Sequence, residues 1–180
     1  MENTYLFSAL RLFKYYKSLG DAAILRCDAD KIHFKLNEES NSMALLVRHI
    51  SGNMMSRWTD FMTTDGEKPW RNRDSEFADP EWDKETLIAQ WEKGWVTLFA
   101  AIELLEAEDL GKVVYIRNEG HTVMEAINRQ IAHYAYHVGQ VVFLAKAITT
   151  EWETLSIARN KSTDYNADKF SKDKGKRHFI

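Results

Sequence analysis

The stretch "TVMEAINRQIAHYAYHVGQVVFLAKAI", residues 122–148, is the best-marked helix of the sequence. It opens with a capping box, because Thr122 can cap a helix and Glu125 follows three residues later. Apolar residues then recur at the spacing of three and four that places them on one helical face. This stripe consists of Ile127, Ile131, Tyr134, Val138, Val141 and Ala145. The stretch therefore predicts a long amphipathic helix with one side in a hydrophobic core.

Three further segments show the same periodicity. We expect helices over residues 4–27, from Asn41 or Ser42 to about residue 62, and over residues 83–107. Only eight glycines and two prolines occur in 180 residues, which favours long uninterrupted helices over a turn-rich β architecture. Four long amphipathic helices predict an all-α protein with a four-helix bundle in residues 1–150.

The remaining segments connect or follow these helices. Residues 63–82 form a long loop with turn signals, and its aromatic residues argue against disorder. Residues 110–121 contain "KVVYI" and fit either a short strand or an extended connection. Residues 151–180 are polar, and we expect a C-terminal extension, packed on the bundle or partly flexible, with a short helix near 163–171.

Composition excludes several classes of protein. The net charge is −3 and no helix face is basic, so nucleic-acid binding is not expected. No run of about 18 apolar residues occurs, so no transmembrane helix is expected. The single cysteine, Cys27, allows no intramolecular disulfide, and no targeting signal is visible. Together these features predict a soluble, cytoplasmic protein.

Two histidines stand four residues apart in the best-marked helix. At 100° per residue, His133 and His137 lie 40° apart at the border of the apolar face, with their Cβ atoms about 6 Å from each other. They could be hydrogen-bonded core histidines or two ligands of one metal ion. The spacing alone does not decide between these interpretations.

His49 is the natural third ligand. It occupies the same border position on the helix that begins near Ser42, so three neutral imidazoles could meet if the two helices face each other. Three histidines with open coordination positions are typical of a catalytic metal site. Imidazole suits several divalent transition metals, of which we expect zinc or nickel.

Further polar residues could assist such a site. Asn53 is one turn from His49, and Gln140 is one turn from His137, so both could support a ligand or bind substrate, or simply be buried amides. The 63–82 loop holds Lys68, Arg71 and Arg73 close to Trp70, and they could form a lid or rim that recognises an acidic cofactor or substrate. The alternative is a solvated charged loop with one aromatic anchor.

The sequence resembles the DinB-like superfamily of four-helix bundles. The motifs are "LLVRHISGNM" at 45–54 and "INRQIAHYAYHVGQVVFLAK" at 127–146. "GNMMSRWTDFMTTDGEKPWRNRDSEF" at 52–77, "LSIARNKS" at 155–162 and the closing "KRHF" are similar to a bacterial subgroup of unknown function. The resemblance covers nearly the whole chain.

This resemblance implies a divalent metal bound by His49, His133 and His137. Some relatives are metal-dependent transferases that use bacillithiol, mycothiol or glutathione, and many form dimers. We therefore expect a thiol S-transferase that acts on small electrophiles in detoxification or stress response, with a low-molecular-weight thiol as co-substrate. A homodimer is expected from the resemblance and from the abundance of aromatic residues. The alternatives are a metal-dependent hydrolase of a small substrate and a non-catalytic, metal-binding stress protein.

Overall fold

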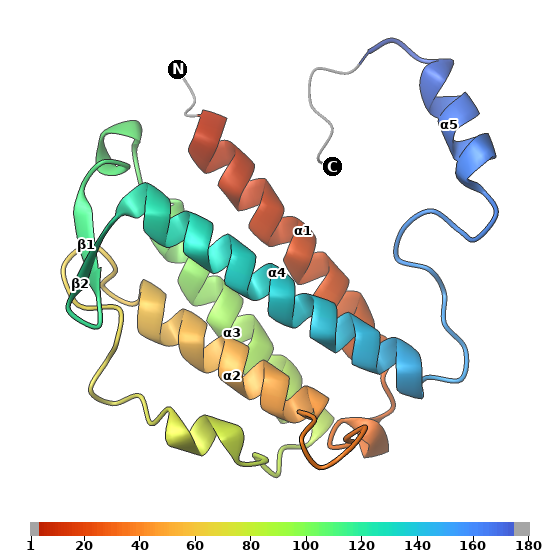
Figure 1. Cartoon of the computed structure of the whole chain (residues 1–180), viewed down its shortest axis with the longest axis horizontal. Helices are drawn as coiled ribbons and strands as arrows, with labels where there is room; N and C mark the ends of the chain where they lie inside the picture. Colours follow the sequence, from red (N-terminus) through yellow and green to blue (C-terminus); the bar gives the residue numbers. More distant parts are fainter. Residues whose placement is uncertain (1–3, 175–180) are drawn as a thin grey trace.

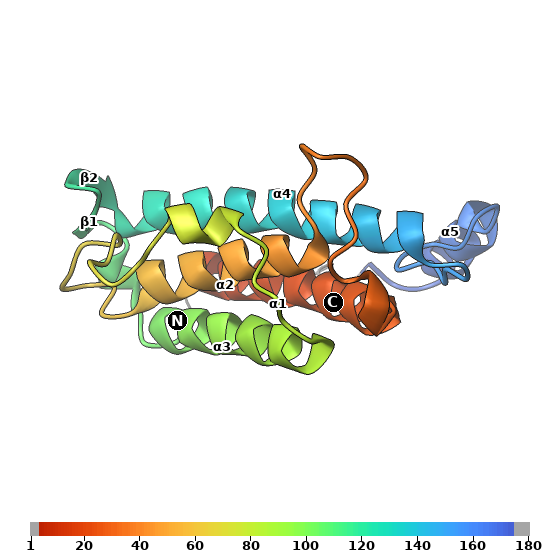
Figure 2. The ribbon, with the colours of Figure 1, turned by 90° about the horizontal axis from the view of Figure 1, so that it is seen from below.

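The computed structural model describes residues 4–174, which contain four long helices. These are α1 (Thr4–Arg26), α2 (Met43–Trp58), α3 (Lys84–Ile102) and α4 (Val123–Ile148). The most extensive contacts join α2 to α3 and α1 to α4, and α2 also packs on α4. Figures 1 and 2 show the four helices side by side with their axes roughly aligned. The prediction of a mostly helical protein is confirmed.

Hydrogen-bonding caps fix where the helices begin. Thr122 accepts a hydrogen bond from the Glu125 N–H at 3.2 Å, and the Glu125 carboxylate accepts one from the Thr122 N–H at 2.8 Å. The predicted capping box is therefore confirmed. Ser42 Oγ accepts from the Leu45 N–H at 3.2 Å, so Ser42 caps α2. Such caps satisfy backbone donors that the first helical turn leaves unpaired.

Two helices end earlier than the sequence predicted. We expected α2 to reach about residue 62, but it ends at Trp58, because Thr59 is extended and Asp60 takes a positive φ of 48°. We expected the next helix to span 83–107, but α3 ends at Ile102. Glu106 then opens a new capping box, which starts the short 3₁₀ helix η3 (Ala107–Asp109).

Aromatic side chains fill the centre of the helical core. Phe13, Trp95 and Tyr134 are fully buried, and their ring centroids lie 6.0–6.5 Å apart. The Tyr134 hydroxyl accepts a hydrogen bond from Trp58 Nε1 at 3.1 Å and donates one to Asn53 Oδ1 at 3.0 Å. The phenol is thus buried with its polar atom paired, as a buried polar group requires.

A hairpin anchors the long connection between α2 and α3. Strands β1 (Val113–Ile116) and β2 (Glu119–Thr122) pair antiparallel, so the segment that could be a strand or an extended connection is a strand pair. The Gly66 N–H donates to the Tyr115 carbonyl at 2.8 Å, and Asp65 accepts from the backbone N–H of Asn118 at 2.7 Å. These bonds hold the start of the connection beside α4.

The C-terminal segment contains the expected short helix, α5 (Ser162–Phe170), all of whose residues are exposed. In Figure 1 it lies apart from the four long helices. Before it, Trp152 packs partly against the core and carries the Arg26 guanidinium 5.4 Å from its ring centroid. The motif "KRHF" lies outside the described residues. Within 4–174, no helix is long and apolar enough to cross a membrane.

Two helical glycines, Gly94 buried on α3 and Gly139 exposed on α4, give opposite expectations for the same substitution. A Cβ at Gly94 would lie 2.9 Å from Ser51 Cα, whereas one at Gly139 would meet nothing within 4 Å. We expect Gly94→Ala to lower the free energy of unfolding by about 1–3 kcal/mol, because it forces α3 away from α2. Gly139→Ala should raise it by up to about 1 kcal/mol through helix propensity. Urea denaturation measures both, and equal effects would contradict the close approach of α2 and α3.

Candidate metal centre

Three histidines from two helices meet at one point. His49 from α2 and His133 and His137 from α4 each place a ring nitrogen within 4.8 Å of the others. Their ring centroids lie 4.7–5.5 Å apart. His49 is buried and the other two are partly buried. The three residues singled out in the sequence are therefore brought together, in a cluster that could hold a metal ion.

The electrostatics of the cluster favour neutral imidazoles on α4. Burial, together with the neighbouring His137, His49 and two arginines, lowers the pKa of His133 to about 3. Burial also lowers the pKa of His137, although its hydrogen bond with Gln140 opposes that shift. Both rings therefore carry a free lone pair at neutral pH, as metal ligation requires.

Hydrogen bonds at the Nδ1 atoms orient two of the rings. His49 Nδ1 lies 3.0 Å from Glu76 Oε2, and since a carboxylate can only accept, Nδ1 donates. His137 Nδ1 donates to Gln140 Oε1 at 2.8 Å. In both rings the lone pair is left on Nε2. His137 Nε2 faces His133 Nε2 at 3.1 Å. Two ligand nitrogens of a tetrahedral zinc ion lie about 3.3 Å apart, so the spacing fits a shared ion.

A buried ion pair holds the carboxylate that orients His49. Arg71 donates from Nε to Glu76 Oε1 at 2.7 Å and from Nη2 to Oε2 at 2.8 Å. The two side chains are 2% and 7% exposed. Burial raises the pKa of Glu76, but its bonds to His49 and Arg71 outweigh this and hold the pKa below its usual value. Glu76 is thus ionised and forms a carboxylate–histidine pair of the kind that supports metal ligands.

The backbone on both sides of the Glu76–His49 contact allows the two side chains to approach each other. Glu76 lies in the 3₁₀ helix η2 (Asp74–Phe77), and the Phe77 ring stacks on His49 with centroids 6.0 Å apart. On α2, a Cβ at Gly52 would lie 2.7 Å from Glu76 Oε1. Only glycine lets the carboxylate approach the helix this closely, so Gly52 is part of the support for His49.

Sequence comparison gives the family of this chain. Residues 1–161 match a family described as "Protein of unknown function (DUF1572)". The chain belongs to the DUF1572 family. This confirms the expected membership of a family of unknown function, and the DinB-like relationship stays a prediction. No curated protein matches the sequence significantly.

In this DUF1572 protein the other residues singled out from the sequence differ in how close they lie to the histidine cluster. Gln140 contacts His137, and Asn53 is buried beside His49 with its Oδ1 bonded to Tyr134. Arg71 reaches the cluster through Glu76. Arg73 lines a cavity next to His49, whereas Trp70 is 58% exposed and lies outside that lining. The loop aromatic that touches the histidines is Phe77.

Sequence reasoning missed two residues near the cluster. Glu76 gave no signal, because it lies in an irregular segment where spacing does not reveal which side chain turns inward. Gln130 did give one, since it shares the helical face of His133 three residues earlier. It is buried, and it lines the cavity beside His49 and His133.

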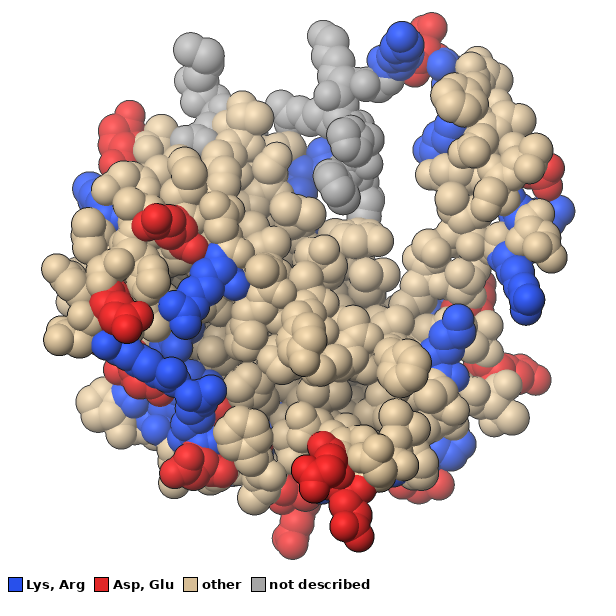
Figure 3. Space-filling model, viewed as in Figure 1, with Lys and Arg blue, Asp and Glu red and all other residues tan. Residues whose placement is uncertain are grey.

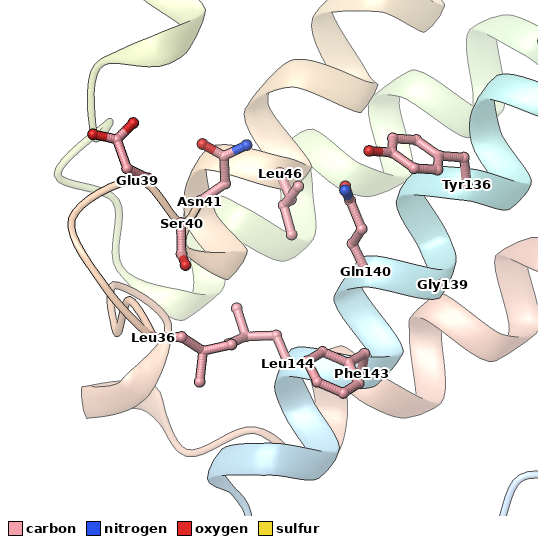
Figure 4. Close-up of a pocket in the computed structure, with 10 residues that line it drawn as sticks. All are labelled: Leu36, Glu39, Ser40, Asn41, Leu46, Tyr136, Gly139, Gln140, Phe143 and Leu144. Carbon is pink, nitrogen blue, oxygen red and sulfur yellow. The ribbon is translucent and has the colours of Figure 1, made fainter.

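Openings flank the histidines on both sides. A cavity of about 140 Å³ is lined by His49, Asn53, Gln130, His133 and five arginines. A larger pocket of about 420 Å³ lies beside Gln140, between α4 and the 36–41 segment, as Figure 4 shows. Its lining mixes apolar Leu36, Leu46 and Phe143 with polar groups. The cluster is therefore open to the arginine-lined cavity, and the larger pocket comes nearest to it at Gln140.

The Arg71–Glu76 pair gives a prediction about stability. We expect Arg71→Gln and Glu76→Gln each to lower the free energy of unfolding by about 3–5 kcal/mol, because each leaves a buried charge uncompensated. In the double variant, the loss in free energy of unfolding should be clearly smaller than the sum of the losses in the two single variants. Urea denaturation of the wild type, the two single variants and the double variant gives this double-mutant cycle. Arg73→Gln, in the same connection but exposed, is the control and should change stability by less than about 0.5 kcal/mol. Additive losses in the double variant would contradict the pairing.

Proposed function

We propose that this protein is a DinB-like four-helix bundle that binds a divalent metal through His49, His133 and His137. We further propose that it acts as a metal-dependent thiol S-transferase on small electrophiles. The observation that carries the proposal is the convergence of the three rings, with His49 and His137 each fixed by a hydrogen bond at Nδ1. Zinc and nickel both suit a set of imidazole ligands.

Three protein ligands would leave coordination positions open for a reactant. A divalent ion supplies charge that lowers the pKa of a bound thiol or water and polarises an electrophile. The protein groups have separate tasks. Glu76 and Gln140 orient ligand rings, and Phe77 covers one face of His49. The pocket beside Gln140 has apolar surface suited to the body of a small electrophile.

Thiol transfer is favoured over hydrolysis by the carboxylates near the cluster. Hydrolysis usually needs a general base within reach of the attacking water. Glu76 is the carboxylate in contact with the cluster, and both its oxygens are engaged by Arg71 and His49. In the described part of the chain, the potential ligand group contains histidines alone. A thiol starts from a pKa of about 8.5, far below that of water, so a bound thiol would release its proton to solvent at neutral pH and attack without such a base, which supports a transferase better. A detoxification or stress role, a cytoplasmic location and a homodimer accompany this proposal.

Metal binding is tested by metal analysis of tag-free protein purified without added metal. We expect near-stoichiometric zinc or nickel in the wild type and its loss in His133→Ala, because the variant removes one of three ligands. Glu76→Gln should still bind, with affinity reduced about 10–100-fold, since it weakens the bond that orients His49. His121→Ala, a histidine outside the cluster, is the control. A folded wild type that takes up no metal in a titration would overturn the proposal.

Activity is tested by a screen of low-molecular-weight thiols with a model electrophile. We expect consumption of both, loss of activity on chelation and recovery when the metal is restored. Turnover of ester or amide substrates without a thiol would instead support the hydrolase. If neither reaction occurs and chelation changes only the melting temperature, the protein is a non-catalytic metal binder.

A further inference from the structure

Five arginines surround the small cavity beside the histidine cluster. They are Arg57, Arg71, Arg73, Arg117 and Arg129, and they come from α2, the α2–α3 connection, the hairpin and α4. Figure 3 shows basic side chains gathered on the side of the molecule where the hairpin lies in Figure 1. His49 and His133 line the same cavity, so anything bound there lies next to the proposed metal.

The floor of the cavity has buried donors without acceptors. The side chains of Arg57 and Arg71 are 6% and 2% exposed. Arg57 Nε and Arg71 Nη1 have no hydrogen-bond partner. Glu67 Oε1 is 3.8 Å from Arg71 Nη1, too far for a hydrogen bond. An unpaired buried donor on a charged group is costly, so these guanidinium groups carry more donors than the neighbouring protein acceptors satisfy.

The charges around the cavity do not cancel. The carboxylates that pair with these arginines are Glu67, which contacts Arg57, Arg71 and Arg117, and Glu76, which contacts Arg71. Five positive charges less two negative ones leave +3. Within residues 4–174, Arg73 and Arg129 have no carboxylate at ion-pair distance. These two exposed residues form the rim.

Only some of these arginines have a structural role in holding the α2–α3 connection in place. Arg57 donates to the Gly66 carbonyl, Arg71 fixes Glu76, and Arg117 pairs with Glu67 at 3.1 Å. Arg73 and Arg129 have no comparable task, although Arg129 lies 3.4 Å from His121 Nε2. Guanidinium groups that converge from four segments around one hollow form an arrangement suited to an oxyanion.

We propose that this cavity binds the oxyanion group, a carboxylate or a phosphate, of a small organic substrate or thiol co-substrate and so places its reactive part at the histidine cluster. The role as a substrate subsite rests on the function proposed above, but anion binding itself does not. At about 30 Å³ for each water-sized group, 140 Å³ holds roughly four or five non-hydrogen atoms with their surroundings, which is enough for one carboxylate or phosphate group. Gln130, an uncharged polar residue, is also buried and lines the same cavity.

The test is titration calorimetry of the full chain with inorganic phosphate and with succinate, before and after removal of metal by a chelator. We expect saturable binding of at least one anion in both metal states. Arg73→Gln and Arg129→Gln should each weaken it about tenfold, and the double variant about 100-fold, because each removes a charge-assisted bond. Tighter binding of phosphate would identify a phosphate ester as the substrate class, and tighter binding of succinate a carboxylic acid.

The matched control is Arg159→Gln, which removes the same charge from an exposed position near the C-terminus and should leave affinity within about twofold. Circular dichroism confirms that each variant is folded. Three results would overturn the inference: no saturable binding of either anion, equal weakening in Arg159→Gln, or binding that disappears with the metal and is unchanged in the rim variants. If the protein binds no metal but still binds the anion through Arg73 and Arg129, the anion site stands and the metal-dependent function fails.

Discussion

The Arg71–Glu76 ion pair, inside the irregular α2–α3 connection, holds the carboxylate that joins this connection to α2. The carboxylate of Glu76 is buried against α2, where hydrogen bonds from Arg71 and His49 keep it ionised. The same carboxylate orients His49, so the direction of a ring on α2 depends on a residue 27 positions later. The α2–α3 connection must therefore be folded before the histidine cluster has its observed geometry, and the hairpin that holds the connection becomes part of the site.

Helical geometry supplies the other half of the cluster. His133 and His137 need no special backbone, because a separation of four residues places them on one face of α4. What fixes that face toward His49 is the core beneath it: Tyr134, the residue after His133, is fully buried between Phe13 and Trp95. Its hydroxyl reaches Asn53 one turn from His49. Packing of one tyrosine thus sets the rotation of α4 relative to α2.

Sequence periodicity predicted the regular helices, but it could not predict the structure of the irregular α2–α3 connection. The four long helices, the cap at Thr122 and the shared face of His133 and His137 follow from spacings of three and four residues, whereas the complete histidine set was implied by the resemblance. Glu76 could not be found in this way, because its side chain turns inward only through the path of an irregular connection and the absence of a Cβ at Gly52. The early end of α2 at Trp58 has a similar origin. Tertiary hydrogen bonds, such as the one from Ser56 Oγ to the Gly66 carbonyl at 2.7 Å, stabilise a turn after the helix that local sequence propensity does not predict.

The two openings along α4 differ in a way that constrains any substrate. Residues 129–133 line the arginine-rich cavity, and residues 136–144 line the larger, partly apolar pocket, with His137 between them. A molecule that spans both would place its anionic group among guanidinium groups and its apolar part beside Leu46 and Phe143. His49 and His133 line the arginine-rich cavity, whereas the larger pocket reaches the cluster only as far as Gln140, whose side chain contacts His137. The two openings therefore place the anionic part of a ligand, and not its apolar part, directly beside the histidines.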